Sequence, residues 1–105
     1  MAQWDVYANP SVRTRDAVPY LVDLQSDLLA GIGSRLVAPL VRSRLLSPGL
    51  PRGLCPAFTV AGEMLVLMPH EAGPISPRLL KDSVASLRAQ AHDIVAALDA
   101  VVSGV

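Results

Sequence analysis

Residues 35–42 read RLVAPLVR, a run of Leu, Val, Ala and Pro between two arginines. A short apolar run bounded by turn residues is typical of a β-strand. The preceding Gly31-Ile32-Gly33-Ser34 stretch can adopt positive φ angles and is expected to form a loop. Pro39 has no backbone N–H to donate to a neighbouring strand. We therefore predict a strand over 35–42, with Pro39 marking a sheet edge or a bulge.

Two further strands are predicted on the N-terminal side. Residues 3–8 alternate, with apolar side chains at 4, 6 and 8 and the opposite face at 3, 5 and 7, which indicates a half-buried strand. Asn9-Pro10-Ser11 ends it, and the polar stretch 11–16 is interpreted as a loop. Residues 20–24 (YLVDL) follow Pro19 and are rich in residue types that favour strands.

On the C-terminal side the pattern predicts a hairpin and then loops. Residues 58–60 and 63–68 flank Ala61-Gly62, a two-residue turn in which glycine supplies a positive φ. Residues 45–56 contain five prolines and glycines, too many for a regular element. Residues 69–74 form a second predicted loop, and a short strand is expected around Ile75.

The last third changes to a helical period. Ser76 is a plausible N-cap with Pro77 at the first helical position, and a later start near Asp82-Ser83 is left open. One apolar stripe is formed by residues spaced three or four apart: Leu80, Val84, Leu87, Ala91, Ile94, Leu98 and Val101. We therefore expect five or more short antiparallel strands followed by one C-terminal helix.

Composition limits the class of protein. The chain has 105 residues, sufficient for a single domain over 1–105, and 51% are hydrophobic, which excludes an intrinsically disordered chain. Nine acidic residues balance nine basic ones, which argues against a broad basic field for nucleic acid. So many apolar residues in a small neutral domain favour an oligomer.

Membrane insertion and export are not indicated. The longest stretch without a charged residue, 53–62, is ten residues long, whereas a spanning helix needs about 20. The N-terminus MAQWDVYANP lacks the features of a signal peptide. Cys55 is the single cysteine, so no intrachain disulfide and no cysteine-only metal site can form. We expect a soluble cytosolic protein.

The sequence gives little support for a catalytic role of any side chain. His70 and Glu71 could form an acid–base pair, but neighbours in sequence point in different directions, so exposed loop residues are the favoured interpretation. His92 has no ligand type at helical spacing, and with Asp93 it is placed on a solvated face. Cys55 lacks a local base and is interpreted as a small buried hydrophobe.

Two other features point away from nucleotide or nucleic-acid binding. Residues 31–34 lack the phosphate-loop and dinucleotide fingerprints. Arg35, Arg42 and Arg44 lack interleaved aromatic residues and are interpreted as surface charges. The residues by themselves favour binding over catalysis.

The chain ends AVVSGV over 100–105, without a charged side chain. Free tails are usually polar. Two interpretations stay open: Val101 and Val102 pack as the last turn of the helix, or the helix end is an apolar docking surface for another protein.

The stretches YLVDLQSD (20–27), GSRLVAPL (33–40) and SRLLS (43–47) together resemble the CcdB family, the toxins of CcdA–CcdB toxin–antitoxin systems. The resemblance covers nearly the whole chain. It implies a mainly β, α+β fold related to SH3-like barrel toxins: an antiparallel sheet, a smaller β wing and a C-terminal helix. It also implies a cytoplasmic homodimer that is not an enzyme and needs no cofactor or metal.

The family's activity is implied in the same way. Its dimers bind the A subunit of DNA gyrase and trap gyrase with cleaved DNA. A CcdA-type antitoxin neutralises the toxin, and the pair represses its own operon, so contact with DNA is indirect. Alternatives are a CcdB-fold protein with another protein target or with antitoxin binding alone, and an endoribonuclease toxin. The endoribonuclease would have to use His70, Arg78 and Arg35, and the neutral net charge argues against it.

Particular residues carry the resemblance to the gyrase contact. At the C-terminus, Gly104 matches the family's glycine and Val105 replaces isoleucine. Ser103 stands in place of the family's tryptophan, and Asp99 in place of asparagine. Three more residues match supporting positions near the gyrase-facing surface: Ser26, and Leu28 and Leu29, which replace isoleucines.

Overall fold

The structure is a computed structural model that describes residues 2–29, 31–43 and 54–104. Its long helix is α1 (Ala91–Ser103). The strands are β1 (Asp5–Ala8), β2 (Tyr20–Asp23), β3 (Arg35–Arg42), β4 (Ala57–Val60), β5 (Glu63–Leu67), β6 (Gly73–Ile75) and β7 (Ala85–Ser86). Short 3-10 turns lie between them: η1 (Asp27–Leu29), η3 (Pro69–Glu71), η4 (Pro77–Leu79) and η5 (Arg88–Gln90).

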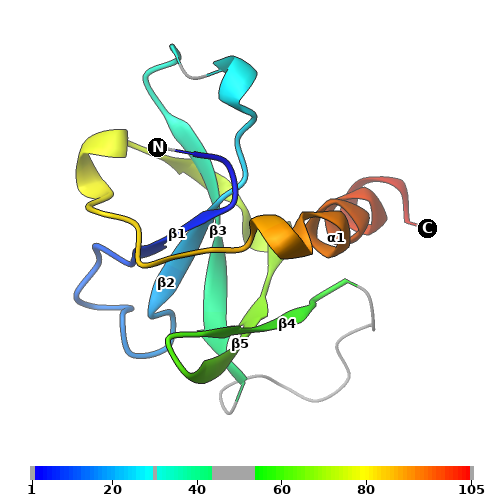
Figure 1. The fold of residues 1–105 in the computed structure, drawn as a ribbon, viewed down its shortest axis with the longest axis horizontal. Coiled ribbons are helices and arrows are strands. Elements are labelled where there is room, and N and C mark those ends of the chain that lie inside the picture. The colour runs from blue at the N-terminus through cyan, green and yellow to red at the C-terminus, as the bar shows by residue number, and fades with distance from the viewer. Residues whose placement is uncertain (1, 30, 44–53, 105) are drawn as a thin grey trace.

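The strands form one antiparallel sheet in the order β4-β5-β3-β2-β1-β7, with β6 paired to β3. The sheet curves into a nearly closed barrel, and α1 projects to one side of it (Figure 1). The predicted hairpin is confirmed as β4 and β5, joined by Ala61 at φ 52° and Gly62 at φ 81°. The fold is therefore the expected mainly β architecture with a single C-terminal helix. The expectation for the loop at 45–56 falls mostly on residues outside the described ranges.

The strand over 35–42 has the predicted bounds, but the expectation of an edge at Pro39 is wrong. β3 is central, with β2 along one side and β6 and then β5 along the other. β6 pairs with residues 35–37 and β5 with residues 40–42, so Pro39 lies where β3 changes partner. Its carbonyl accepts from Met68 N at 3.1 Å. A missing N–H is tolerated there because neither β6 nor β5 pairs with that position, although β2 places Leu21 opposite it.

The expected helix start near Ser76 is also wrong. Residues 77–90 form two 3-10 turns and the short strand β7, and α1 begins only at Ala91. The open edge of β1 accounts for the difference: Val84 N donates to Val6 O, and Leu87 N donates to Trp4 O, both at 2.8 Å. Pairing satisfies backbone groups that a helix over these residues would leave unpaired. Ser76 does cap a turn, since its side chain accepts from Arg78 N.

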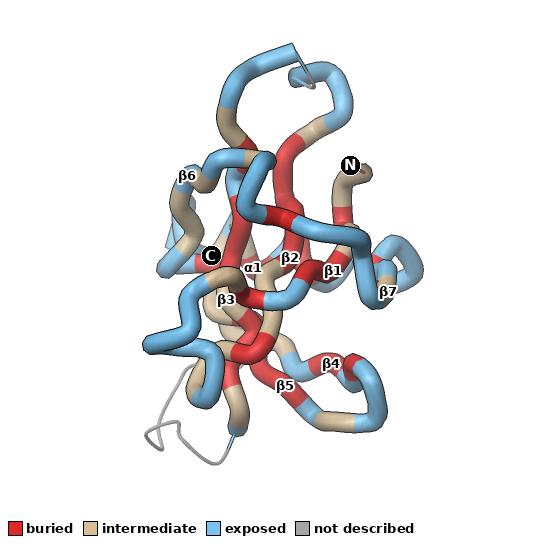
Figure 2. The backbone as a smooth tube through the Cα atoms, turned by 90° about the vertical axis from the view of Figure 1, so that its left-hand side faces the viewer, coloured by how far each residue is buried: buried red, intermediate tan, exposed pale blue. Residues whose placement is uncertain are grey.

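Two apolar clusters hold the sheet together. The larger is formed by side chains in and beside β1 to β5 packed against Leu87 and Ile94. The smaller is formed by Tyr7 of β1, Val37 of β3 and Leu80, which follows η4. Figure 2 shows buried backbone along these strands and exposed backbone in the loops. Tyr7, placed on the polar face of its strand by the alternation, is buried for this reason.

Candidate functional surface

The loop after β2 exposes apolar side chains. Leu28 is 93% exposed, Leu29 47% and Ile32 52%. Ser26 organises the loop: its hydroxyl accepts from Leu28 N at 3.2 Å, and its carbonyl accepts from Leu29 N at 3.0 Å. The three resemblance residues Ser26, Leu28 and Leu29 therefore lie together, and Ile32 joins them because its N–H donates to Leu29 O.

Gln25 lies beneath this loop and is 8% exposed. Its side-chain Nε2 donates to Leu29 O at 3.1 Å, and its Oε1 accepts from Leu36 N at 2.9 Å. One planar amide therefore ties the loop to β3. Such a bridge restricts the loop because both of its partners are backbone groups.

A buried ion pair supports Gln25. The Arg35 guanidinium donates through Nε and Nη2 to Asp23 Oδ2, and the two side chains are 4% and 0% exposed. Asp23 Oδ1 accepts from Gln25 N at 2.9 Å. The interpretation of Arg35 as a surface charge is wrong: its strand carries it inward, where a paired carboxylate is needed to hold the charge.

Arg42 is also paired, through Nε to Glu63 Oε2 at 2.7 Å, and this hydrogen bond raises the pKa of Arg42. Arg44 lies outside the described residues.

The first turn of the chain closes against the same loop. Gln3 N donates to Asp27 Oδ1 at 3.1 Å, and Gln3 Nε2 donates to Leu24 O at 3.2 Å. Asp5 N donates to Ala2 O across this turn, which places Trp4 at φ 75° with its side chain buried. A left-handed non-glycine residue is strained, and burial of the indole offsets the strain.

The end of α1 forms a second exposed surface. Val102 is 86% exposed and Val101 38%. Ser103 Oγ donates to Asp99 O at 2.6 Å, and Gly104 caps the helix at φ 74° with its N–H on Ala100 O. Val101 and Val102 do lie in the last turn of α1, as one of the two interpretations has it, but Val102 is not packed against the described part of the chain. Val105 lies outside the described residues.

The residues that resemble the family's gyrase contact lie on two separate elements, the loop after β2 and the last turn of α1 (Figure 1). Within the described ranges, the hydrogen bonds of each group stay on its own side and none joins the two. A partner that contacts both would have to span the space between them.

The candidate catalytic residues are scattered. His70 and Glu71 are exposed in η3, as expected for loop residues, and His92 and Asp93 are exposed on α1. Burial raises the pKa of the half-buried Cys55 thiol, the opposite of what a nucleophile needs. Among the described residues, no three acidic, His or Cys side chains are grouped as metal ligands.

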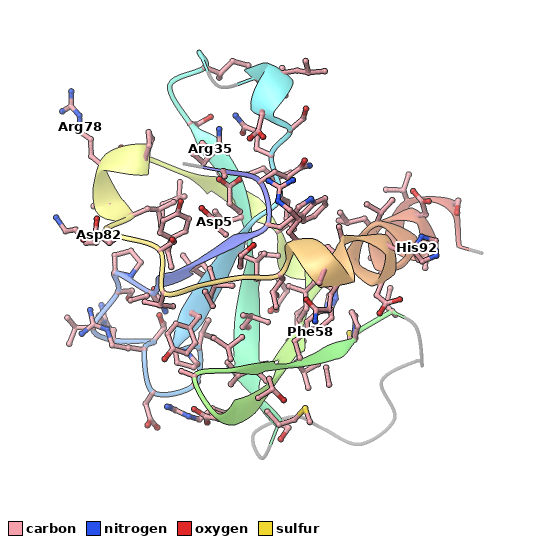
Figure 3. The ribbon with its side chains drawn as sticks, in the orientation of Figure 1. Asp5, Arg35, Phe58, Arg78, Asp82 and His92 are labelled. Carbon is pink, nitrogen blue, oxygen red and sulfur yellow. The ribbon has the colours of Figure 1, made fainter. Side chains whose placement is uncertain are left out.

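The three residues that an endoribonuclease would need do not form a group of free side chains. Arg35 is buried on Asp23, whereas Arg78 points away from the body of the protein (Figure 3). A guanidinium held by a buried carboxylate is not available to bind a phosphate.

No helix in the part of the chain that the structure describes has the length and apolar character needed to traverse a bilayer.

The first comparison with known proteins concerns the fold. The fold is similar to that of the Mycobacterium tuberculosis toxin MazF-mt6, with a TM-score of 0.68, 12% sequence identity, and 94% of each chain covered. At this identity the likeness shows a shared fold.

A family profile described as CcdB protein matches residues 3–104. The chain belongs to the CcdB family and is a toxin of the toxin–antitoxin type.

The described residues that carry the resemblance to the gyrase contact lie on two exposed surfaces, but the residues that support the loop after β2 were not predicted from the sequence. Asp23, Gln25 and Arg35 stood in the stretches that carry the resemblance, and none was assigned a site role at the contact. Their signal is a pair of opposite charges and an amide inside apolar strands, residue types that are seldom buried without partners.

Proposed function

We propose that this protein is a gyrase poison: a cytoplasmic homodimer that binds the A subunit of DNA gyrase and traps the cleaved gyrase–DNA complex. A CcdA-type antitoxin neutralises it, and the two repress their operon together. In this proposal the protein holds the cleaved complex by binding and performs no catalysis of its own.

The observation that carries the proposal is the exposed apolar surface at the family's contact positions. Leu28 and Leu29 on the loop and Gly104 at the helix end stand where the resemblance places the contact. Isolated exposed apolar residues are common, but several fixed in one short loop are typical of an interaction surface. Ser103 is exposed and bonded within its own helix, so it supplies little of the contact area that a tryptophan would supply.

The direct test is a cleavage-complex assay with purified protein, gyrase of its own host, supercoiled plasmid and ATP. Linear DNA after denaturation is the expected result. Its absence with correctly folded protein would favour a CcdB-fold protein with another target or with antitoxin binding alone. RNA cleavage and antitoxin pull-downs would then be the next measurements.

Deleting Gly104 and Val105 is the matched variant for that assay. Of these two residues the structure describes Gly104, whose N–H donates to Ala100 O as a helix cap and which belongs to neither apolar cluster. We expect an unchanged fold by circular dichroism and no linear DNA. Full activity of the shortened chain would overturn the proposed contact.

Replacing Ser103 with tryptophan should strengthen the interaction. The position is exposed, so the larger side chain displaces no core residue. Stacking on a cationic group of the partner would improve binding by about 1–2 kcal/mol. Calorimetry with the gyrase A subunit measures this, and an unchanged affinity would contradict this placement of the contact.

A further inference from the structure

We propose that Gln25 is a positioning residue that holds the described part of the loop 26–34, residues 26–29 and 31–34, in the conformation presented to the partner. This inference rests on the proposed function, in which Leu28 and Leu29 contact gyrase. It concerns a residue that does not itself form the contact.

The geometry gives Gln25 control over the tip of the loop. Its amide accepts from Leu36 N on β3 and donates to Leu29 O, four residues further along the chain. Both backbone groups of Leu29 are hydrogen-bonded, because Leu29 N donates to Ser26 O and Leu29 O also accepts from Ile32 N, each at 3.0 Å. The side chain of Gln25 thus fixes the position of the exposed residues relative to β3.

The backbone of Gln25 is itself fixed from below. Asp23 Oδ1 accepts from its N–H at 2.9 Å, and Arg35 Nη2 lies 3.5 Å from its carbonyl oxygen. Asp23 and Arg35 are buried against each other, so they give Gln25 a rigid base. The chain of contacts runs from the ion pair through Gln25 to Leu29.

The exposed side chains cannot hold this loop by packing. Leu28, Leu29 and Ile32 are roughly half-exposed or more, so the conformation depends on the polar contacts beneath them. A loop already fixed in its bound conformation loses less entropy on association. Removing the Gln25 amide should therefore weaken binding without altering any side chain that touches the partner.

The test compares Gln25→Met with Asn9→Leu, each close in shape to the original side chain but without its hydrogen bonds. Asn9 is also a buried amide that holds a loop, bonded to Thr14 Oγ1 at 2.9 Å and Val18 O at 2.8 Å. Both variants lose buried hydrogen bonds, so both should lose stability. The full-length protein is used in each case.

Two readouts are made at concentrations where both variants are folded. For Gln25→Met we expect hydrogen exchange at the Leu29 and Ile32 amides to accelerate at least about tenfold and the dissociation constant for the gyrase A subunit to rise about tenfold. Asn9→Leu should change neither quantity. Equal effects of the two variants, or unchanged exchange in Gln25→Met, would overturn the positioning role.

A second variant covers the case in which Gln25→Met fails to fold. Gln25→Glu keeps an acceptor for Leu36 N, replaces the donor to Leu29 O with a carboxylate oxygen that repels this carbonyl, and adds a buried negative charge. At neutral pH, where the carboxylate cannot donate, it should reproduce the faster exchange and weaker binding. If the original chain does not bind gyrase, the proposed function fails, while the exchange rates still decide whether Gln25 fixes the loop. Fast exchange with unchanged affinity would also overturn the inference.

Discussion

Two loops of this protein are each anchored by one buried side-chain amide, but they expose side chains of different character. The loop 10–18 is held by Asn9, which is 5% exposed and bonds Thr14, Val18 and Ser11. The loop 26–34 is held by Gln25, which is 8% exposed and bonds Leu29 and Leu36. In both, one buried side-chain amide replaces the ladder hydrogen bonds that a strand would have supplied.

The two loops differ in the side chains that they expose and in the residues on which the anchoring amide rests. The loop 10–18 carries two arginines and exposes one large apolar side chain, Val12, whereas the described part of the loop 26–34 exposes three. Gln25 also rests on the buried Asp23–Arg35 pair. The comparison teaches that an ordered loop is not by itself a binding loop, and that apolar exposure on a rigid base is what distinguishes the second one.

The largest expected effect comes from removing the base of the second loop. Asp23→Asn leaves the Arg35 guanidinium buried without a counter-charge, and breaking a buried pair in this way costs about 3–5 kcal/mol. Urea unfolding followed by the fluorescence of the buried Trp4 measures the loss, at one fixed protein concentration because association would shift the midpoint.

The matched control is Glu63→Gln, which removes the carboxylate from Arg42 at a partly exposed pair. A clearly smaller loss is expected there because solvent screens the interaction. Similar losses in the two variants would show that the Asp23–Arg35 pair is no more important than a surface pair.

The second prediction compares the tips of the two loops. Leu28→Ser and Val12→Ser each change a side chain that is mostly exposed, at 93% and 79%, so each should alter the free energy of unfolding by no more than about 0.5 kcal/mol. Affinity for the gyrase A subunit should fall about tenfold or more for Leu28→Ser alone, since burying a leucine contributes about 1.5–3 kcal/mol. Calorimetry with both variants makes the comparison, and equal affinities would remove the distinction between the loops.

The smallest expected effect is a loss of stability at alkaline pH caused by ionisation of Tyr7, whose pKa is influenced by the charge of Asp23. Burial, followed by the charges of Asp5 and Asp23, raises the pKa of Tyr7 above 10.0. Above pH 10 the unfolded chain loses this phenol proton first, so the folded state binds more protons and the free energy of unfolding falls as pH rises. Below pH 10 the contribution is fully present.

Tyr7→Phe should remove part of this alkaline decline. Denaturation is measured between pH 8 and 11 in a Cys55→Ser background, because burial also raises the pKa of Cys55 and contributes with the same sign. Tyr20→Phe is the matched control on the neighbouring strand. An unaltered decline in Tyr7→Phe would assign the effect to other groups.

Elements with strong local signals were predicted well. RLVAPLVR gave a strand with the observed bounds, and Ala61-Gly62 gave the observed turn, because each depends on residues close in sequence. The predicted helix start is wrong because the spacing of Leu80 and Leu87 fits a helix equally well. Leu80 instead ends η4, and the hydrogen bonds of Val84 N and Leu87 N to the free edge of β1 keep residues 84–87 out of a helix. The prediction that Arg35 is a surface charge was wrong because a charged side chain is expected at the surface unless a buried partner is known.

The sequence by itself determined the mainly β architecture, the C-terminal helix and the family, since these follow from local patterns and from short stretches of matching residues. Tertiary structure alone decided that Pro39 sits where β3 changes partner, that residues 84–87 pair with the edge of β1, and that Gln25 rests on Asp23 and Arg35. The first two depend on which distant backbone groups need a hydrogen-bond partner, and the third depends on two charged side chains that meet only when β2 and β3 pair. That requirement is met only when the strands have come together.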